Sequence, residues 1–455
     1  MDIIQGRIDR VLQLQNLLFS EGTNTATPIL IAREMINDYP AKMFTDPKET
    51  FVDKHCGIGT ELIAIIERLN KELRDVIKDD TARIKHIIEN QIFGWEINKS
   101  RYQSTVACLK EIAGADIAVN IKNSNVLAEE EEFKMKQFTL DVGNPPFNDE
   151  SGDARDASQN SNNSVHYIEF VKLGFPIEYL KSGSKYLKFP LPGGWTMKVK
   201  DVTLFQNNGL KSVKFKSSSV FPNVKIRTGV TIVEFEKSYK GDITITTTSG
   251  ETYTQSRTDP IQDVGVELKS LLSNIWKASG LNGKVTHGDY QIPKGTKGDI
   301  EKLVISCSTF NKTQTSKFNT NVLIYSGGEQ RPASYLWSSE MLDSTNGYKV
   351  TWPKASDKFL LGKVRIMKPG EGVSSANYYI KCKTLVEAKK WVSWLEHKLV
   401  RLSVKIRKTN DTVNTYNNCM NYIPVLPDCD INDDSNLIKY FNYKKEQYGR
   451  VDAYI

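Results

Sequence analysis

The chain has 455 residues, long enough to bury a large core in two or three domains, of which we expect two. It contains no apolar run of membrane-spanning length, and its first residues lack the basic-then-apolar order of a signal peptide. We therefore expect a cytoplasmic protein with no membrane contact. The six cysteines and five histidines are dispersed without a Cys-x-x-Cys pair, which argues against a disulfide framework and against a metal site.

The net charge of +7 is unevenly distributed along the chain. Residues 181–240 hold twelve Lys or Arg against three acidic residues, and residues 381–408 hold nine against two. Two basic zones on a balanced protein favour binding of a polyanion, although a solvated lysine-rich face explains the charge equally well.

Strands and helices alternate in the first part of the chain. The first twenty residues read as an amphipathic helix, and Thr27-Pro28 is a typical helix start, with threonine as the cap and proline in the first turn. The next elements are predicted in chain order as strand 51–53, helix 61–74, helix 81–90, strand 91–95, helix 99–113, strand 115–121 and strand 138–142. This alternation predicts an α/β fold with a doubly wound, mostly parallel sheet that binds ligands at the carboxyl ends of its strands.

The middle of the chain begins with residues 148–164, which are polar and predict a loop that orders around a substrate. An ordinary surface loop is the alternative. A helix over 165–180, strands 185–189 and 213–215, and an antiparallel edge hairpin of 229–236 with 243–248 follow. Beyond about residue 250 the strands become short and irregular until one strong helix at 384–408, so we expect a catalytic domain at 1–250 and a mixed α+β domain at 251–455.

Asn144-Pro145-Pro146-Phe147, directly after the apolar run 138–142 and one glycine, suits the activation of a planar amine. The lone pair of such an amine is delocalised into its ring. The Asn144 side-chain oxygen and the Pro145 carbonyl can draw it out by accepting hydrogen bonds from the two N–H groups. Pro145 and Pro146 stiffen the loop, and Phe147 offers a flat face for stacking. The alternative is a strand that simply stops at two prolines.

A nucleoside pocket is indicated at the ends of the first two strands. Gly57 and Gly59 let the backbone approach a ligand, Asp53 suits an ammonium group, and Glu96 suits the two hydroxyls of a ribose. Leu62 stands where a dinucleotide fingerprint has its third glycine, which favours S-adenosylmethionine instead. Read singly, Asp53 is also consistent with a helix-capping acid and Glu96 with a solvated strand end.

Together these residues resemble the S-adenosylmethionine-dependent adenine-N6 DNA methyltransferases of the restriction–modification type, in which the cofactor half precedes the catalytic half. The resemblance covers roughly residues 23–250. Asn144-Pro145-Pro146-Phe147 is similar to the catalytic signature of that family, and three other segments are similar to its motifs for the methionine tail, the cofactor loop and the ribose: Thr27-Pro28, Asp53–Gly59 and Ile92–Asn98. More loosely, Tyr378–Ile380, the helix near 391–405 and Ile423-Pro424 resemble the recognition-domain endings of combined restriction–methylation proteins.

Two departures from the family pattern affect the pocket. Lys54 and His55 replace the proline and small residues that usually follow the acid, and Asn125 stands where an adenine-contacting acid is expected. Asn125 retains the capacity to hydrogen-bond a base edge, whereas His55 reads as incidental. These departures concern affinity and individual contacts more than reaction type.

The resemblance implies a Rossmann-like methyltransferase fold and an enzyme that methylates a flipped-out adenine in a specific sequence of double-stranded DNA, in a prokaryotic or phage-infected cell. No metal is needed, residues 251–455 would read the DNA, and cleavage would belong to a separate restriction endonuclease. The alternatives are an RNA adenine methyltransferase, a protein glutamine methyltransferase, or a decayed methylase scaffold that only binds DNA. Asp263 and Glu267-Leu-Lys269 superficially resemble a nuclease site, but their spacing predicts the start of a surface helix.

Overall fold

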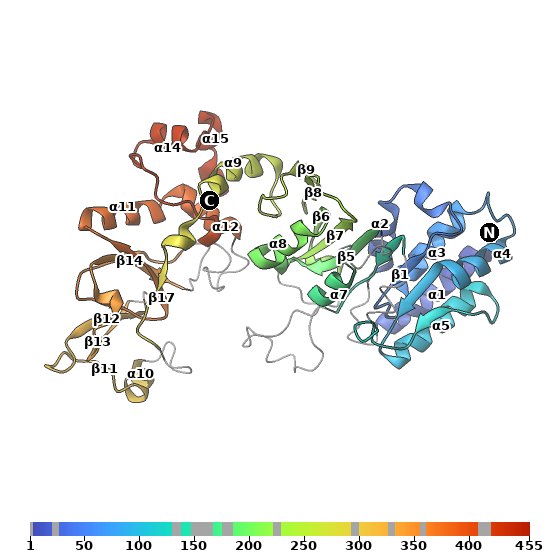
Figure 1. Cartoon of the computed structure of the whole chain (residues 1–455), viewed down its shortest axis with the longest axis horizontal. Coiled ribbons are helices and arrows are strands. Elements are labelled where there is room, and N and C mark those ends of the chain that lie inside the picture. The colour runs from blue at the N-terminus through green and yellow to red at the C-terminus, as the bar shows by residue number, and fades with distance from the viewer. Residues whose placement is uncertain are drawn as a thin grey trace. The chain divides into compact units, whose positions relative to one another are not determined.

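The structure is a computed structural model that describes residues 3–20, 27–129, 138–146, 167–174, 185–221, 229–292, 300–325, 333–354, 361–407 and 420–455. Internal contacts divide the chain into two units (Figure 1). The first comprises Met1–Thr196 and Lys200–Asp263, and the second Met197–Val199 and Val264–Ile455. None of the described helices combines the length and apolar character needed to cross a bilayer.

A nine-stranded sheet organises the first unit, in the order β3-β2-β1-β4-β5-β7-β6-β8-β9. Its strands are β1 (Phe51–Asp53), β2 (Ile92–Trp95), β3 (Asn120–Lys122), β4 (Leu140–Val142), β5 (Tyr186–Pro192), β6 (Leu210–Lys216), β7 (Val230–Glu236), β8 (Ile243–Thr246) and β9 (Thr252–Gln255).

The half of the sheet that runs from β3 to β5 is entirely parallel. Every residue of β1 and of β4 is buried, as is usual for strands covered on both faces. In β1, Phe51 points into the large cluster with the helices, whereas Val52 packs on the other face with Trp95 and Phe138. The prediction of a doubly wound, mostly parallel sheet is confirmed, although β3 is shorter than the strand expected over 115–121.

Antiparallel strands occupy the other half of the sheet, but the predicted hairpin of β7 with β8 is wrong. β7 pairs antiparallel with both β5 and β6, so both of its edges are already used. β8 therefore pairs with the free edge of β6, in parallel, and turns back to form a hairpin with β9. Because β9 completes this sheet, the first unit extends to Asp263, beyond the boundary expected near residue 250.

Helices cover both faces of the sheet. One hydrophobic cluster packs α1 to α5 against one face of the sheet. A second cluster packs α7 and α8 against the opposite face, over β5 to β8. The helices are α1 (Ile3–Ser20), α2 (Ile29–Asn37), α3 (Thr60–Glu72), α4 (Asp80–His86), α5 (Lys99–Ala113), α7 (Tyr167–Gly174) and α8 (Val199–Asn207). Short helical turns are η1 (Ala41–Phe44), the π-helical η2 (Ile87–Gln91), η3 (Gly193–Met197) and η4 (Ser218–Val220).

Local sequence signals set several helix ends. The Asn98 side chain accepts a hydrogen bond from the Arg101 amide at 3.0 Å to cap α5, and Gly114 ends that helix with φ of 69°. Thr27 does not cap α2 as predicted. The residue before the helix is Pro28, and the Pro28 carbonyl, rather than a side chain, accepts the first helical hydrogen bonds.

Acidic side chains of the first unit neutralise part of the basic zone at 181–240. Lys188 is nearly buried and lies 2.7 Å from Asp38 and 3.5 Å from Glu234. Further ion pairs join Lys211 to Glu234 and Glu236, Lys214 to Glu34 and Asp38, and Lys216 to Glu34. Lys188, Lys214 and Lys216 thereby link the α2 segment to the sheet, whereas Lys211 pairs within the sheet. Together these ion pairs leave fewer charges of the zone for a polyanion.

The second unit contains two four-stranded sheets, in the orders β10-β17-β14-β15 and β11-β13-β12-β16. Their strands are β10 (Thr286–His287), β11 (Phe310–Asn311), β12 (Thr320–Tyr325), β13 (Ser334–Ser338), β14 (Tyr348–Pro353), β15 (Arg365–Met367), β16 (Gly372–Val373) and β17 (Asn377–Cys382). Short strands with helices around them match the mixed α+β character expected of this part of the chain.

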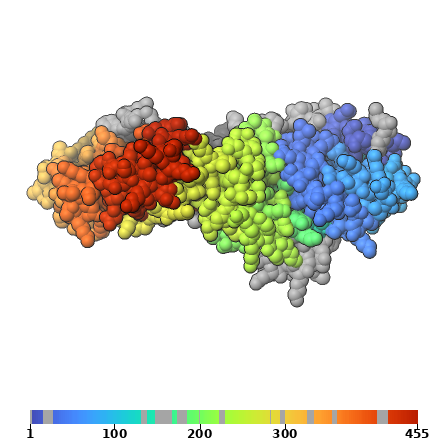
Figure 2. All heavy atoms as spheres, turned by 90° about the horizontal axis from the view of Figure 1, so that it is seen from above, coloured from blue at the N-terminus to red at the C-terminus, as the bar shows by residue number. Residues whose placement is uncertain are grey.

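The helix predicted over 384–408 is two helices, α11 (Leu385–Leu395) and α12 (Lys398–Arg407). The Trp394 ring stacks on His397 in the break, and its indole N–H donates to the Pro424 carbonyl at 3.0 Å. α11 packs against β14 and β15, within the orange-to-red part of Figure 2. The remaining helical segments are α9 (Val266–Lys277), η5 (Leu281–Lys284), α10 (Ile300–Ser306), η6 (Asp343–Thr345), η7 (Met420–Tyr422), α14 (Asp434–Tyr440), α15 (Lys445–Gly449) and η8 (Val451–Tyr454).

Ile66→Ala should destabilise the first unit by about 2–5 kcal/mol, because it leaves a cavity in α3 where Ile66 is fully buried. Ile3→Ala removes the same atoms from a side chain that is 71% exposed and serves as the matched control. Urea unfolding measures both. Equal losses in the two variants would show that α3 does not pack in the core as described.

Candidate functional site

Three segments meet at the carboxyl edge of the parallel strands. Asp53 ends β1, Glu96 follows β2, and Gly143–Pro146 follows β4. The register places them close together, because Val52 pairs with Asp141 and Asp53 pairs with Gly94. The sequence prediction that these residues share one edge therefore agrees with the strand pairing.

Asp53 is fully buried at the centre of this edge. Its Oδ1 accepts a hydrogen bond from the His55 amide at 3.1 Å, while its Oδ2 is buried without a hydrogen-bond partner among the residues that the structure describes. Burial raises the pKa of Asp53 well above its ordinary value. A buried carboxyl oxygen that lacks a partner is costly, so this atom is suited to receive a cationic ligand.

The glycine loop lies beside Asp53 and is held by side chains from two helices. Gly57 and Gly59 have φ of 56° and 87°, values that side chains other than glycine rarely adopt. The Thr105 hydroxyl donates to the Gly57 carbonyl at 2.8 Å, and the Gln15 amide donates to the Ile58 carbonyl at 2.6 Å. Sequence analysis did not identify Thr105 or Gln15, because both lie outside the motif.

Glu96 joins β2 to the glycine loop. Its Oε2 accepts from the Gly57 amide at 2.9 Å, and its Oε1 accepts from the Asn98 amide at 2.7 Å. The carboxylate is thus fixed in orientation by two backbone donors. Each oxygen retains a further lone pair for a ligand hydroxyl.

Thr27 lies near a second buried acid that the motif search missed. Glu61, in the first turn of α3, is 4% exposed, and Thr27 is fully buried. Burial and the neighbouring Asp53 raise the pKa of Glu61 to about 8, although the Thr27 hydroxyl beside it opposes the shift. The site therefore includes one buried polar group, formed by Thr27, Asp53 and Glu61. In the sequence, the position of Glu61 two residues after Gly59 was the signal that could have identified it.

The Asn144 loop packs directly on the Asp53 segment. Asn144 is half-buried, Pro145 is buried and Pro146 is exposed, whereas Phe147 lies outside the described residues. A Cβ at Gly143 would lie 2.3 Å from Asp53 Oδ1 and 2.5 Å from His55 Cε1, so only glycine fits there. The two predicted motifs are thus in van der Waals contact at Gly143.

His55 is part of this packing. Its Nδ1 lies 3.2 Å from Asp53 Oδ1, and its ring centre lies 5.4 Å from that of Phe189. Burial and the nearby Lys54 lower the pKa of His55 to about 3, so the imidazole is neutral at physiological pH. The expectation that His55 is incidental overlooks these contacts.

Asn125 has a local role in the structure. Its side-chain oxygen accepts from the Leu127 amide at 3.0 Å and so closes an exposed turn. The neighbouring Asn123 instead reaches Glu96, donating to the Glu96 carbonyl at 2.8 Å. No described contact joins Asn125 to Asp53 or to Asn144, and its ligand role remains a prediction.

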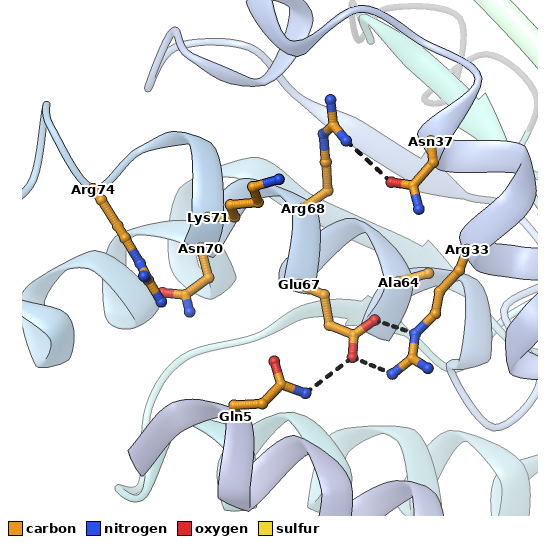
Figure 3. A pocket seen from close by; sticks show the side chains of 9 residues that line it. All are labelled: Gln5, Arg33, Asn37, Ala64, Glu67, Arg68, Asn70, Lys71 and Arg74. Atoms are coloured by element: carbon orange, nitrogen blue, oxygen red, sulfur yellow. Dashed lines mark hydrogen bonds and ion pairs between the residues drawn. The ribbon is translucent and has the colours of Figure 1, made fainter. Parts of the chain in front are cut away.

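A separate polar cleft of about 540 Å³ is formed by side chains of α1, α2, α3 and the residues just after α3 (Figure 3). None of the predicted site residues lines it. Arg33 and Gln5 both point toward Glu67, and the Arg33–Glu67 pair is bidentate, at 2.7 and 2.6 Å. Its charges are largely satisfied within the protein.

The residues that superficially resemble a nuclease site have other partners. Asp263 accepts hydrogen bonds from the amide and hydroxyl of Thr248, at 2.8 and 2.5 Å. Glu267 is in the first turn of α9 and pairs with Arg450, as the prediction of a surface helix requires. Within the described ranges, no three His, Cys, Asp or Glu side chains are grouped as metal ligands.

Residues 14–174 match the family model described as N-6 DNA Methylase. This segment is therefore similar to the N-6 DNA methylase family. It contains Thr27, the glycine loop, Glu96 and the Asn144 loop, and thus all the residues that meet at the sheet edge. No curated protein matches the sequence.

Solved structures of restriction–modification proteins are similar to this chain. A nuclease-deletion mutant of the Type ISP enzyme LlaGI, solved with a DNA substrate mimic, has a TM-score of 0.50 and 11% identity over 95% of this chain and 47% of its own. A modification subunit of a putative type I restriction enzyme from Vibrio vulnificus YJ016 has a TM-score of 0.39 and 15% identity, over 61% and 60%. The chain thus spans less than two thirds of either protein.

Stability should fall with increasing pH because of Glu61. Its folded pKa, about 8, lies above the ordinary value of 4.5, so the folded protein holds the proton more tightly than the unfolded chain. Stability is then greatest below pH 4.5 and decreases up to about pH 8. Glu61→Gln has no such loss, and its melting temperature should exceed that of the wild type by a margin that widens between pH 5 and pH 8.5.

Scanning calorimetry at pH 5, 6.5 and 8.5 measures this margin. Glu111→Gln, on the exposed surface of α5, controls for the change from carboxylate to amide. A margin for Glu61→Gln that does not vary with pH would contradict the buried position of the carboxyl.

Proposed function

We propose that this protein transfers a methyl group from S-adenosylmethionine to the N6 amino group of an adenine in double-stranded DNA. The observation that carries the proposal is the contact, at Gly143, between the segment that begins at Asp53 and the Asn144-Pro145-Pro146 loop. It puts a cation-binding carboxyl beside a pair of acceptors for a planar amine. The match of residues 14–174 to the N-6 DNA Methylase family model supports the same chemistry.

The described residues fit the cofactor. The buried Asp53 Oδ2, without a hydrogen-bond partner in the described part of the chain, suits the ammonium of the methionine tail. Glu96, held by two backbone amides, suits the ribose hydroxyls, and Gly57, where a Cβ would meet nothing within 4 Å, leaves space for close approach. Thr27 and Pro28 would border the methionine tail. The bound cofactor supplies a methyl group activated by its sulfonium.

The Asn144 loop acts on the substrate amine. The Asn144 side-chain oxygen and the Pro145 carbonyl accept hydrogen bonds from the two amino hydrogens, which makes the nitrogen more tetrahedral and more nucleophilic. Because Pro145 and Pro146 restrict the backbone, the two acceptors are already in position before the substrate binds. After methyl transfer one N6 proton passes to solvent, and the demethylated cofactor would leave as a neutral thioether. No covalent enzyme intermediate is required. Phe147 would stack on the flipped base.

DNA is the proposed carrier of the base. The second unit, with its two small sheets, would read the sequence, and its basic helices α11 and α12 would contact phosphates. The LlaGI structure, which shares the fold over 95% of this chain, holds a DNA substrate mimic. Cleavage would belong to a separate endonuclease chain. If methylation were found only in RNA or only on glutamine, that molecule and not DNA would be the substrate.

Asn144→Ala should reduce methyl transfer by at least about 100-fold, because it removes one of the two amine acceptors, while the Kd for S-adenosylmethionine changes by less than about twofold. Tritiated S-adenosylmethionine incubated with DNA, RNA and protein, followed by nucleoside and amino-acid analysis, identifies the product. Asn90→Ala, at an exposed position in η2, is the matched control. Equal loss of cofactor binding and methyl transfer would rule out this role for Asn144.

Cofactor affinity should rise with pH because the cation binds ionised Asp53, and burial raises the pKa of Asp53 in the cofactor-free protein. At a pH below the pKa of Asp53, the bound cation must displace the proton from the Asp53 carboxyl group. Asp53→Asn should weaken cofactor binding by about 10-fold or more, the equivalent of a hydrogen bond to a charged group. In this variant the increase of cofactor affinity with pH that comes from ionisation of Asp53 should be absent. Calorimetric titrations from pH 6 to 9 measure both. Identical slopes in the two proteins would exclude Asp53 as the ligand of the cation.

A further inference from the structure

A fully buried ion pair joins the first residue after β1 to the middle of β4. Lys54 Nζ lies 2.5 Å from Asp141 Oδ2, and both side chains have no exposed surface. Burial lowers the pKa of Lys54 and raises that of Asp141, whereas their mutual attraction opposes both shifts. Separating two such charges in a water-free interior leaves each uncompensated, so the pair resists relative movement of the chains that carry it.

The pair lies where backbone pairing between β1 and β4 ends. The two strands are in register at Phe51 with Leu140 and at Val52 with Asp141. Beyond that point β1 leads to the glycine loop and β4 leads to Asn144. Lys54 Nζ also lies 4.6 Å from the ring centre of Phe189 on β5, so one ammonium contacts the side chains of two neighbouring strands.

The Gly143 contact makes the position of the catalytic loop sensitive to the position of its neighbour. Because Gly143 has no space for a Cβ against Asp53 and His55, any shift of the segment that Lys54 belongs to must displace residue 143. Asn144 is the next residue in the chain. A displacement of Lys54 should therefore displace the amine acceptors as well, through its contact with Asp141 and the packing at Gly143.

We propose that Lys54 is a positioning residue, which holds the Asn144-Pro145 acceptors in register with the cofactor loop through its ion pair with Asp141. The inference rests on the proposed methyl-transfer function. Misplacement of reacting groups by about 1 Å can cost about 100-fold in rate without affecting ground-state binding. Lys54 thus compensates for the missing proline that usually stiffens this position in the family.

Lys54→Met keeps a long side chain but removes the charge. We expect kcat for methyl transfer to fall about 10- to 100-fold, whereas the Kd values for S-adenosylmethionine and for DNA stay within about threefold. Arg83→Met is the matched control, because Arg83 is also a fully buried cation, on α4, where it donates to Asn70 at 2.9 Å and to the Ile77 carbonyl at 2.8 Å. The control variant should lose stability but keep kcat at a temperature where it is folded.

A double-mutant cycle separates positioning from general damage. Asp141→Asn alone should lower kcat as Lys54→Met does. The double variant Lys54→Met/Asp141→Asn should lower kcat no further than either single change. Gly143→Ala, which leaves both charges in place, should also lower kcat with cofactor binding retained. Additive losses in the cycle would contradict the inference.

Hydrogen exchange provides a readout that does not depend on activity. Amides of the peptide 138–146 should exchange faster in Lys54→Met than in the wild type and in Arg83→Met. Unchanged exchange in folded Lys54→Met would overturn the positioning role. A wild-type protein that binds S-adenosylmethionine but methylates neither nucleic acid nor protein would instead contradict the proposed function, so the two failures are distinguishable.

Discussion

Parallel pairing of β1 with both β2 and β4 is the constraint on which the rest of the first unit depends. It brings three chain segments to one edge, each at the point where a buried strand gives way to a loop. The strands themselves are only three or four residues long. Their side chains are buried on both faces, and the helices that cover them fix the edge, so a short sheet can hold a precise site.

Buried charge is the second organising feature. Asp53, Lys54, Glu61 and Asp141 are all nearly or fully inaccessible to solvent. Such groups are stabilising only when each has a partner, and Lys54 and Asp141 have each other. Asp53 Oδ2 and Glu61 Oε1 are buried without a hydrogen-bond partner among the described residues, which is consistent with a site that gives up stability in order to bind a cation.

The sequence was sufficient for the features that local chemistry determines. The glycine turn and the apolar runs of β1 and β4 predicted the parallel half of the sheet and the strand ends where Asp53, Glu96 and Asn144 lie. It was insufficient where pairing depends on distant residues. Nothing in the run 229–236 indicates that both edges of β7 are used, and the break between α11 and α12 depends on a contact of Trp394 with Pro424.

The departures from the family pattern were interpreted least well from sequence. Lys54 and His55 looked like substitutions that weaken the cofactor motif, because their partners, Asp141 and Phe189, are far away in the chain. Asn125 looked like a replacement for a base-contacting acid; its oxygen accepts a hydrogen bond within a turn, and its role toward a ligand stays a prediction. The role of a polar residue follows from which donor or acceptor it meets, and that is a property of the fold.

The lysines that pair with acidic side chains of the first unit have a consequence for salt dependence. A basic side chain that already faces a carboxylate is less available to neutralise a phosphate, so Lys188, Lys211, Lys214 and Lys216 should displace few of the counterions condensed on DNA. The dependence of DNA affinity on ionic strength would then reflect far fewer contacts than the number of Lys and Arg in residues 181–240. Composition alone overstates how strongly this surface attracts a nucleic acid.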